Sequence, residues 1–195
     1  MEKNEAEAVR RYRLAAEQGL DTAQYNLGIC YIYGRGVATD YTEAAGWLRL
    51  AAEQGLAEAQ HEYGLLCSYG RGVPQDHAEA KKWYRLAAEQ GNAKGQLEIG
   101  MELLAEEDAE GLQWLRLAAE QGNAEAQYYT GVCYSSSRWM VQDYAEAAKW
   151  FRLAAEQGDV NAQNRLGYMY ENGLGVEQDA AEAEKWYTLA GRIGE

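Results

Sequence analysis

The segment LAAEQG occurs five times in this chain of 195 residues, and this repetition constrains the fold more than any other sequence feature. Successive copies lie 36, 36, 31 and 36 residues apart, and a diverged copy, LAGRIG, follows after a further 36. Repeats of this length are typical of small structural units that bury their apolar faces against their neighbours. We therefore predict an array of stacked units. The six copies begin at Leu14, Leu50, Leu86, Leu117, Leu153 and Leu189.

Each unit contains the pattern of two helices. A segment such as AQYNLG, from Ala23, comes first, and the turn YGRGV follows it. The apolar residues Ala44, Trp47, Leu48 and Ala51 then recur at i, i+3, i+4 and i+7, which is one face of a second helix. The equivalent tryptophans are predicted core residues: Trp47, Trp83, Trp114, Trp150 and Trp186.

Acidic and glycine residues predict where these helices begin and end. Asp40 with Glu43 forms a capping box, in which each side chain can satisfy a free N–H at the helix start. The same box is predicted for Asp76/Glu79, Glu107/Glu110, Asp143/Glu146 and Asp179/Glu182. A left-handed glycine is expected after each second helix, at Gly19, Gly55, Gly91, Gly122 and Gly158. Glycines inside each first helix indicate close helix–helix approach, at Gly28, Gly64, Gly100, Gly131 and Gly167.

These patterns predict an all-α solenoid of helix–turn–helix repeats with about eleven helices. We expect a single domain, residues 1–195, with a leading helix at 5–18. Five helix pairs follow in repeats at about 21–56, 57–92, 93–123, 124–159 and 160–195.

Composition excludes several classes of function. The formal net charge of −13 argues against nucleic acid as a partner, because phosphate binding needs clustered Lys and Arg. No apolar run approaches the length of a membrane span, so no membrane insertion is expected. Three cysteines without CxxC spacing predict neither a disulfide framework nor a zinc site. The start, MEKNEAEAVRRY, is no signal peptide, so the protein is expected to be cytoplasmic, or exported with its signal absent from this sequence.

No catalytic, metal or cofactor motif is recognisable in the sequence. His61 and His77 have no nucleophile motif beside them, and the acidic residues are explained by helix caps and solvated faces. We therefore predict a protein that is not an enzyme, with no cofactor and no metal.

The repeated pattern resembles the Sel-1-like repeat (SLR) family, which is related to the tetratricopeptide repeats. The resemblance rests on the recurring A-x-x-x-L-G-x-x-Y, G-x-G-V-x-x-D, A-x-x-W and A-A-x-x-G patterns, and covers nearly the whole chain. It implies a right-handed superhelix with the first helices lining the concave side. It also implies an adaptor or scaffold for protein complexes, common in bacteria.

One subgroup of the resembled family clamps each repeat with paired cysteines, and enzyme-like activities are suggested for it. This chain departs from that pattern, because Cys30 and Cys133 have no partner cysteine in their own repeats. A hydrolase acting on cell-wall or β-lactam-like substrates is therefore an alternative function only. A second alternative is a self-assembling structural module, either monomeric or a weak homodimer through the C-terminal end, where Trp186 and Tyr187 are expected to be partly exposed.

By analogy with tetratricopeptide repeats, two positions on each first helix are expected to be exposed in a concave groove. They lie three residues before and one residue after the helix glycine, so both face the same way. A protein or peptide segment is the expected partner, because aromatic and aliphatic side chains dominate the set. The alternative is that these side chains pack only against neighbouring helices. We name this set the stripe: Tyr25, Ile29, His61, Leu65, Leu97, Met101, Tyr128, Val132, Asn164 and Tyr168.

Two irregularities lie in adjacent repeats. The third repeat has lost essentially its whole glycine turn, and in the fourth Trp139 stands where Gly72 stands in the second. We predict that Trp139 or Met140 covers the gap and shields Leu103 and Leu104. The alternative is that Trp139 is an exposed binding hot spot.

Overall fold

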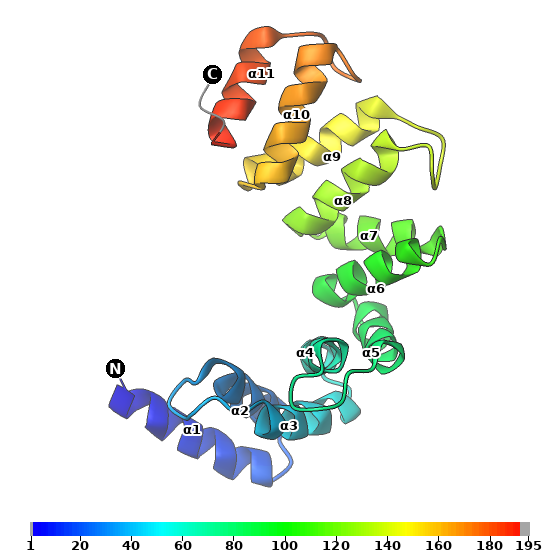
Figure 1. The fold of residues 1–195 in the computed structure, drawn as a ribbon. Coiled ribbons are helices and arrows are strands. Elements are labelled where there is room, and N and C mark those ends of the chain that lie inside the picture. Colours follow the sequence, from blue (N-terminus) through cyan, green and yellow to red (C-terminus); the bar gives the residue numbers. More distant parts are fainter. Residues whose placement is uncertain (1, 192–195) are drawn as a thin grey trace. The chain divides into compact units, whose positions relative to one another are not determined.

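The structure is a computed structural model that describes residues 2–191 of the chain. Those residues form eleven helices and no strand, which confirms the predicted all-α helical-repeat solenoid (Figure 1). The helices are α1 (Glu2–Glu17), α2 (Asp21–Tyr33), α3 (Tyr41–Glu53), α4 (Ala57–Tyr69), α5 (His77–Glu89), α6 (Ala93–Ala105), α7 (Glu110–Glu120), α8 (Ala124–Ser135), α9 (Tyr144–Glu156), α10 (Val160–Asn172) and α11 (Ala180–Leu189).

The chain divides into two compact units, and the boundary falls inside α6. Unit 1 is Met1–Ile99 and unit 2 is Gly100–Glu195. In unit 1 each helix from α1 to α4 packs against the helix that follows it, and in unit 2 the same holds from α7 to α10. Both units are therefore built from contacts between neighbours in the sequence, as expected of a repeat array.

The helix glycines allow the two helices of a repeat to approach closely. A Cβ built on Gly28 would lie 2.6 Å from Leu48 Cγ, and one on Gly64 would lie 2.7 Å from Tyr84 Cε1. Gly100, Gly131 and Gly167 meet Leu115, Phe151 and Tyr187 in the same way, at 2.9, 2.7 and 2.8 Å. The prediction that these glycines serve close packing is confirmed, and it explains why glycine is retained inside five helices despite its cost.

The repeated tryptophans are not the centre of the core. Trp47, Trp83, Trp114 and Trp150 are half-buried, whereas the residue after the tryptophan is fully buried in these helices: Leu48, Tyr84, Leu115 and Phe151. The prediction of core tryptophans is correct only for Trp186, which is 7% exposed. The expectation that Trp186 is partly exposed at the C-terminal end is therefore wrong, whereas Tyr187 is half-buried. Each of these helices buries one face most deeply, and the tryptophan lies at the edge of that buried face.

Four of the five predicted capping boxes supply the helix-start cap. Asp40 Oδ1 accepts from the Thr42 and Glu43 backbone N–H groups at 2.9 and 3.1 Å, and Asp76, Asp143 and Asp179 cap their helices likewise. The prediction for Glu107 is wrong. Because the third repeat has a shortened connection, Glu107 ends α6 in a left-handed conformation, with φ 65°, and Asp108 accepts from Glu110 N instead.

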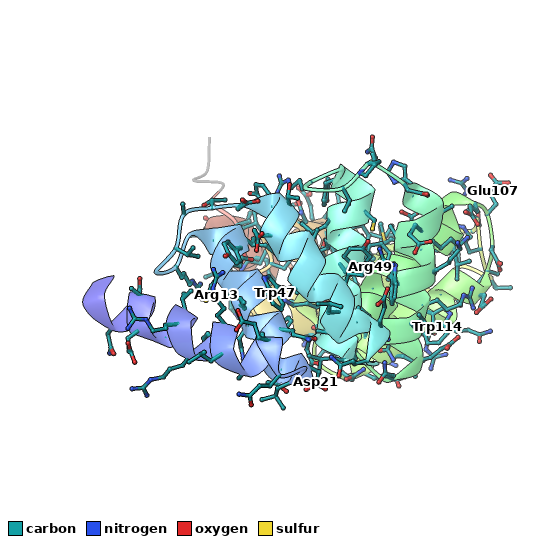
Figure 2. All side chains as sticks on the ribbon, turned by 90° about the horizontal axis from the view of Figure 1, so that it is seen from below. Arg13, Asp21, Trp47, Arg49, Glu107 and Trp114 are labelled. Atoms are coloured by element: carbon teal, nitrogen blue, oxygen red, sulfur yellow. The ribbon has the colours of Figure 1, made fainter. Side chains whose placement is uncertain are left out.

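The glutamate of the box also has a different role from the one predicted. The backbone N–H of Asp40 donates to the carbonyl of Tyr31, at 3.1 Å, so it does not need the side chain of Glu43. Glu43 instead accepts from the Trp47 indole at 3.3 Å. Glu79 and Glu110 accept from Trp83 and Trp114 in the same way, each at 2.9 Å. Figure 2 shows Trp47 on α3 and Trp114 on α7. In these three repeats the box glutamate therefore holds the half-buried tryptophan in place. The Trp150 and Trp186 indoles have no hydrogen-bond partner among the described residues, and Glu146 and Glu182 pair with Lys149 and Lys185 instead.

Candidate protein-binding surface

In unit 1 the stripe is less exposed than predicted. Tyr25, Ile29 and Leu65 are half-buried, but His61 and Leu97 are only 4% and 6% exposed. The His61 ring lies 6.2 Å from that of Tyr84 on α5. Exposure was therefore wrongly predicted for His61 and Leu97, since both are buried, His61 beside the Tyr84 ring of the next helix. Their role in binding stays a prediction.

Acidic side chains lie near Tyr25, one of the half-buried stripe residues of unit 1. The pKa of Tyr25 is raised above its ordinary value, first by burial and then by the nearby charges of Glu62 and Glu58 on α4. Near Tyr25 the stripe of unit 1 therefore combines an aromatic contact with negative charge, which favours a basic over an acidic group on a partner there.

In unit 2 the stripe residues lie nearer the surface. Tyr168 is 50% exposed, while Met101, Tyr128, Val132 and Asn164 are half-buried. The ring of Tyr128 lies 5.9 Å from Phe151, so part of this side chain belongs to the core. Val132 packs against the same core.

A surface cavity of about 360 Å³ brings three of the stripe residues together. Asn164 on α10 donates through Nδ2 to the Val160 carbonyl at 2.9 Å, and its Oδ1 has no hydrogen-bond partner. Tyr187 on α11 donates to Glu171 at 2.9 Å. The cavity is lined by Tyr128, Asn161, Asn164, Arg165, Tyr168 and Tyr187. Aromatic faces, amides and one guanidinium thus converge on a space the size of a few side chains.

A series of buried glutamines was missed by the sequence analysis. Gln60 donates to the Ala52 carbonyl on α3, at 3.2 Å, and its Oε1 accepts from Gln90 at the end of α5, at 2.7 Å. Gln24 and Gln127 make both bonds in the same way. Gln163 makes the first bond, but its Oε1 has no partner. The signal was present in the sequence, as the Gln that follows Ala or Gly in each first helix and the Gln of each AAEQG segment.

The two irregular loops of unit 2 are joined by an ion pair. Arg138 donates to Glu107 at 2.7 Å, and its guanidinium lies 5.0 Å from the centre of the Trp139 ring. Figure 2 labels Glu107 in the loop that follows α6. Trp139 is half-buried and its indole N–H has no partner. The loop with the bulky replacement therefore does reach the shortened loop, through Arg138. That Trp139 covers Leu103 and Leu104, which are both buried, stays a prediction.

Of the two histidines, His77 contacts a hydroxyl, with Nδ1 3.5 Å from Ser68 Oγ, and its Nε2 lies 3.3 Å from the Gln75 amide nitrogen. Over residues 2–191, no three His, Cys, Asp or Glu side chains are placed to hold a metal ion. Cys30, Cys67 and Cys133 are free and buried, and burial raises the pKa of each thiol, to about 11 for Cys133. A thiol with a raised pKa is a poor nucleophile near neutral pH. None of the helices in this range is long and apolar enough to cross a membrane.

Comparison with known protein families identifies the same repeats. The family model described as Sel1 repeat matches residues 1–20, 21–56, 57–92, 105–123, 124–159 and 160–194. The gap at 93–104 falls in the third repeat, which has the shortened connection. No curated protein matches the chain significantly.

Two solved structures are similar in both sequence and fold. The first is a protective antigen of uropathogenic Escherichia coli strains that displays an SLR fold, with 38% identity and a TM-score of 0.87. It is aligned over 94% of this chain, which spans only 40% of that protein. The second is a Sel1 repeat protein from Oxalobacter formigenes, with 36% identity, a TM-score of 0.81 and coverage of 91% and 75%. An immunity protein from Pseudomonas aeruginosa, at 23% identity and a TM-score of 0.60 over 95% and 73%, shares the fold.

Proposed function

Since this chain belongs to the Sel1 repeat family, whose members generally mediate protein–protein interactions, we propose that it is a non-enzymatic adaptor. Its partner is a protein segment that binds the stripe residues within one unit. In unit 2 this segment places a side chain in the cavity between Tyr128, Asn164 and Tyr168.

The observation that carries this proposal is the composition of that cavity. Exposed Tyr side chains provide large contact areas at a low cost in side-chain entropy, and they are enriched in protein interfaces. Asn164 Oδ1 is buried and has no partner, so the Asn164 amide gains a hydrogen bond from a bound segment only if its side chain turns toward the cavity that it lines. The described residues that line the cavity include no His, Cys, Asp or Glu, which is why a hydrolase is the less favoured reading of this site.

A peptide selected from a random display library against the whole chain tests the proposal. We expect Tyr168→Ala to weaken binding of the selected peptide by about tenfold, because an interface aromatic contributes on the order of 1–2 kcal/mol or more. Asn164→Ala is expected to weaken it by a smaller factor.

Leu153→Ala is the matched control for this experiment. Leu153 is 44% exposed, lies on α9 and lines no part of the cavity. If all three variants bind the selected peptides as the parent chain does, the cavity is not the binding site. Circular dichroism of each variant separates loss of binding from loss of helix.

A further inference from the structure

Two loops of unit 1 present arginines that are stacked on tyrosine rings. In the loop between α2 and α3, the Arg35 guanidinium lies 5.0 Å from the centre of the Tyr33 ring. In the loop between α4 and α5, Arg71 lies 5.5 Å from the rings of both Tyr69 and Tyr41. Such cation–π contacts hold a guanidinium in place while leaving its N–H groups available.

The backbone also fixes both arginines. Each lies between two glycines with left-handed φ values, 67° and 69° around Arg35 and 64° and 74° around Arg71. The Arg35 N–H donates to Cys30 O at 3.0 Å, and the Arg71 N–H donates to Leu66 O at 3.0 Å. The two guanidiniums are therefore positioned before any partner binds, which lowers the entropy cost of binding.

Neither arginine has an acidic partner within the described part of unit 1, that is, no carboxylate oxygen within 4.0 Å. Arg138, the equivalent residue of the fourth repeat, is paired with Glu107. The carboxylates that follow the two loops, Asp40 and Asp76, are occupied by the N–H groups of α3 and α5 that they cap. Among the residues whose side chains the structure describes, Arg35 and Arg71 are thus exposed positive charges with no ion-pair partner.

The two loops are neighbours in space. A Cβ built on Gly72 would lie 2.0 Å from the carbonyl oxygen of Tyr41, so the second loop rests on the first turn of α3. Arg71 stacks on this same Tyr41, which directly follows Asp40 at the end of the first loop. Tyr33 and Tyr69, at the two loops, are 60% and 65% exposed. We name this surface the arginine edge: Tyr33, Arg35, Tyr41, Tyr69 and Arg71.

We propose that the arginine edge docks an acidic protein segment, as a second interaction surface separate from the stripe. Each guanidinium binds a carboxylate of the segment through two parallel N–H···O bonds, and the tyrosine faces contact its aliphatic atoms. A short acidic segment fits better than nucleic acid, because two guanidiniums can pair with two carboxylates but cannot neutralise the many phosphates of a long polyanion.

A fluorescently labelled glutamate-rich peptide, titrated with the whole chain and followed by anisotropy, tests this proposal. We expect saturable binding that weakens as salt is added. The double variant Arg35→Gln/Arg71→Gln is expected to bind about tenfold or more weakly, because two charge-assisted contacts are lost. The affinity of Arg35→Lys/Arg71→Lys should lie between that of the parent chain and that of the double glutamine variant, since lysine keeps the charges but loses the paired N–H geometry.

The chain supplies a matched control in Arg138→Gln, which removes a stacked arginine that is already paired and should leave peptide binding unchanged. Tyr168→Ala should also leave it unchanged, so the arginine edge and the stripe can fail independently. The proposal is overturned if the parent chain does not bind the peptide or if the double variant binds it equally well. It is also overturned if a labelled single-stranded oligonucleotide of equal charge binds more tightly. Circular dichroism and thermal unfolding verify that each variant is folded.

Discussion

At the scale of the residue, glycines inside helices differ in whether a neighbouring side chain leaves room for a Cβ. Gly64 in α4 faces Tyr84, with no room for a Cβ. Gly46 in α3 is exposed and would have no neighbour within 4 Å of an added Cβ. Both were visible in the sequence, but only the recurrence of Gly64 at an equivalent position in five repeats indicated a packing role. The identity of the side chain opposite each glycine required the structure.

This difference predicts opposite effects of one substitution. Gly64→Ala should lower the free energy of unfolding by about 1–3 kcal/mol, because the added methyl group overpacks the contact with Tyr84. Gly46→Ala should raise it by up to about 1 kcal/mol, because alanine loses less conformational entropy in a helix. Urea unfolding followed by circular dichroism measures both. Equal effects in the two variants would contradict the packing role of Gly64.

The Cys133 thiol predicts a pH dependence. Burial raises its pKa from 9.0 to about 11, so the folded chain binds more protons than the unfolded chain between these values. This contribution to stability is complete below about pH 9 and is lost as the pH rises towards about 11. Stability should therefore fall over that interval, and the fall should be smaller for Cys133→Val. Urea unfolding at several alkaline pH values measures it, and an unchanged fall in the variant would exclude Cys133 as a source.

At the scale of the element, the sequence predicts helices well and side-chain partners poorly. The four correct acidic caps and the five left-handed glycines set nine of the helix boundaries to within a few residues. The failure at Glu107 has a local cause, since deletion of the turn leaves no room for a residue to cap α7 from that position. The partner of each box glutamate was also missed, because the bond from Asp40 N–H to Tyr31 O joins two helices and is invisible in a local pattern.

The buried glutamines predict that substitution of the glutamine at the end of a second helix lowers the free energy of unfolding. Gln90→Ala removes the donor to Gln60 Oε1 and leaves that atom buried without a partner. We expect a loss of about 1–3 kcal/mol in unfolding free energy. Gln113→Ala, on the exposed face of α7, is the comparison and should change stability by less than about 0.5 kcal/mol. A loss no larger than that of the comparison would mean that water replaces the missing donor.

In the loop at 136–142, substitutions of Trp139 and Val141 are predicted to differ in their effect on stability. Trp139→Ala should destabilise unit 2 by about 1–3 kcal/mol if this half-buried ring covers the shortened connection. Val141, in the same loop, is 88% exposed, so Val141→Ala should be neutral. Amide hydrogen exchange should show faster exchange at residues 103–108 in the first variant only. Unchanged exchange there would favour the alternative that Trp139 serves binding.

At the scale of the whole molecule, the charge is distributed unequally along the chain. Residues 1–99 contain 14 acidic and 11 basic residues, whereas residues 100–195 contain 17 and 7. Total composition predicted an acidic protein and excluded nucleic acid, but it concealed the nearly balanced first half that carries the arginine edge. The stripe was only partly predictable for a related reason. A repeat pattern shows which positions share a helix face, but not whether a neighbouring helix covers them, as it does at His61.

Contacts between sequence neighbours predict how a local defect spreads. Because the stability of a repeat array is approximately a sum of repeat and nearest-neighbour terms, Gly64→Ala should raise exchange rates mainly in α4 and α5. The amides of α9, α10 and α11 should exchange at nearly the parent rate under native conditions. Uniform acceleration along the chain would instead indicate a single cooperative unit.

The paired glutamines also bear on how such a chain lengthens in evolution. The Gln60 amide ties the end of one repeat to the end of the next, and both of its partners lie within about one repeat length along the chain. An in-frame duplication of a 36-residue block therefore copies the glutamine donor and its acceptor together. Each new contact between repeats then has its hydrogen bonds as soon as the duplication occurs. Growth of the array needs no compensating mutation until the motif decays. The sequence carries such a decayed copy at its last repeat, where Ile193 stands in the position that Gln157 occupies one repeat earlier and Gln163 keeps an unused acceptor.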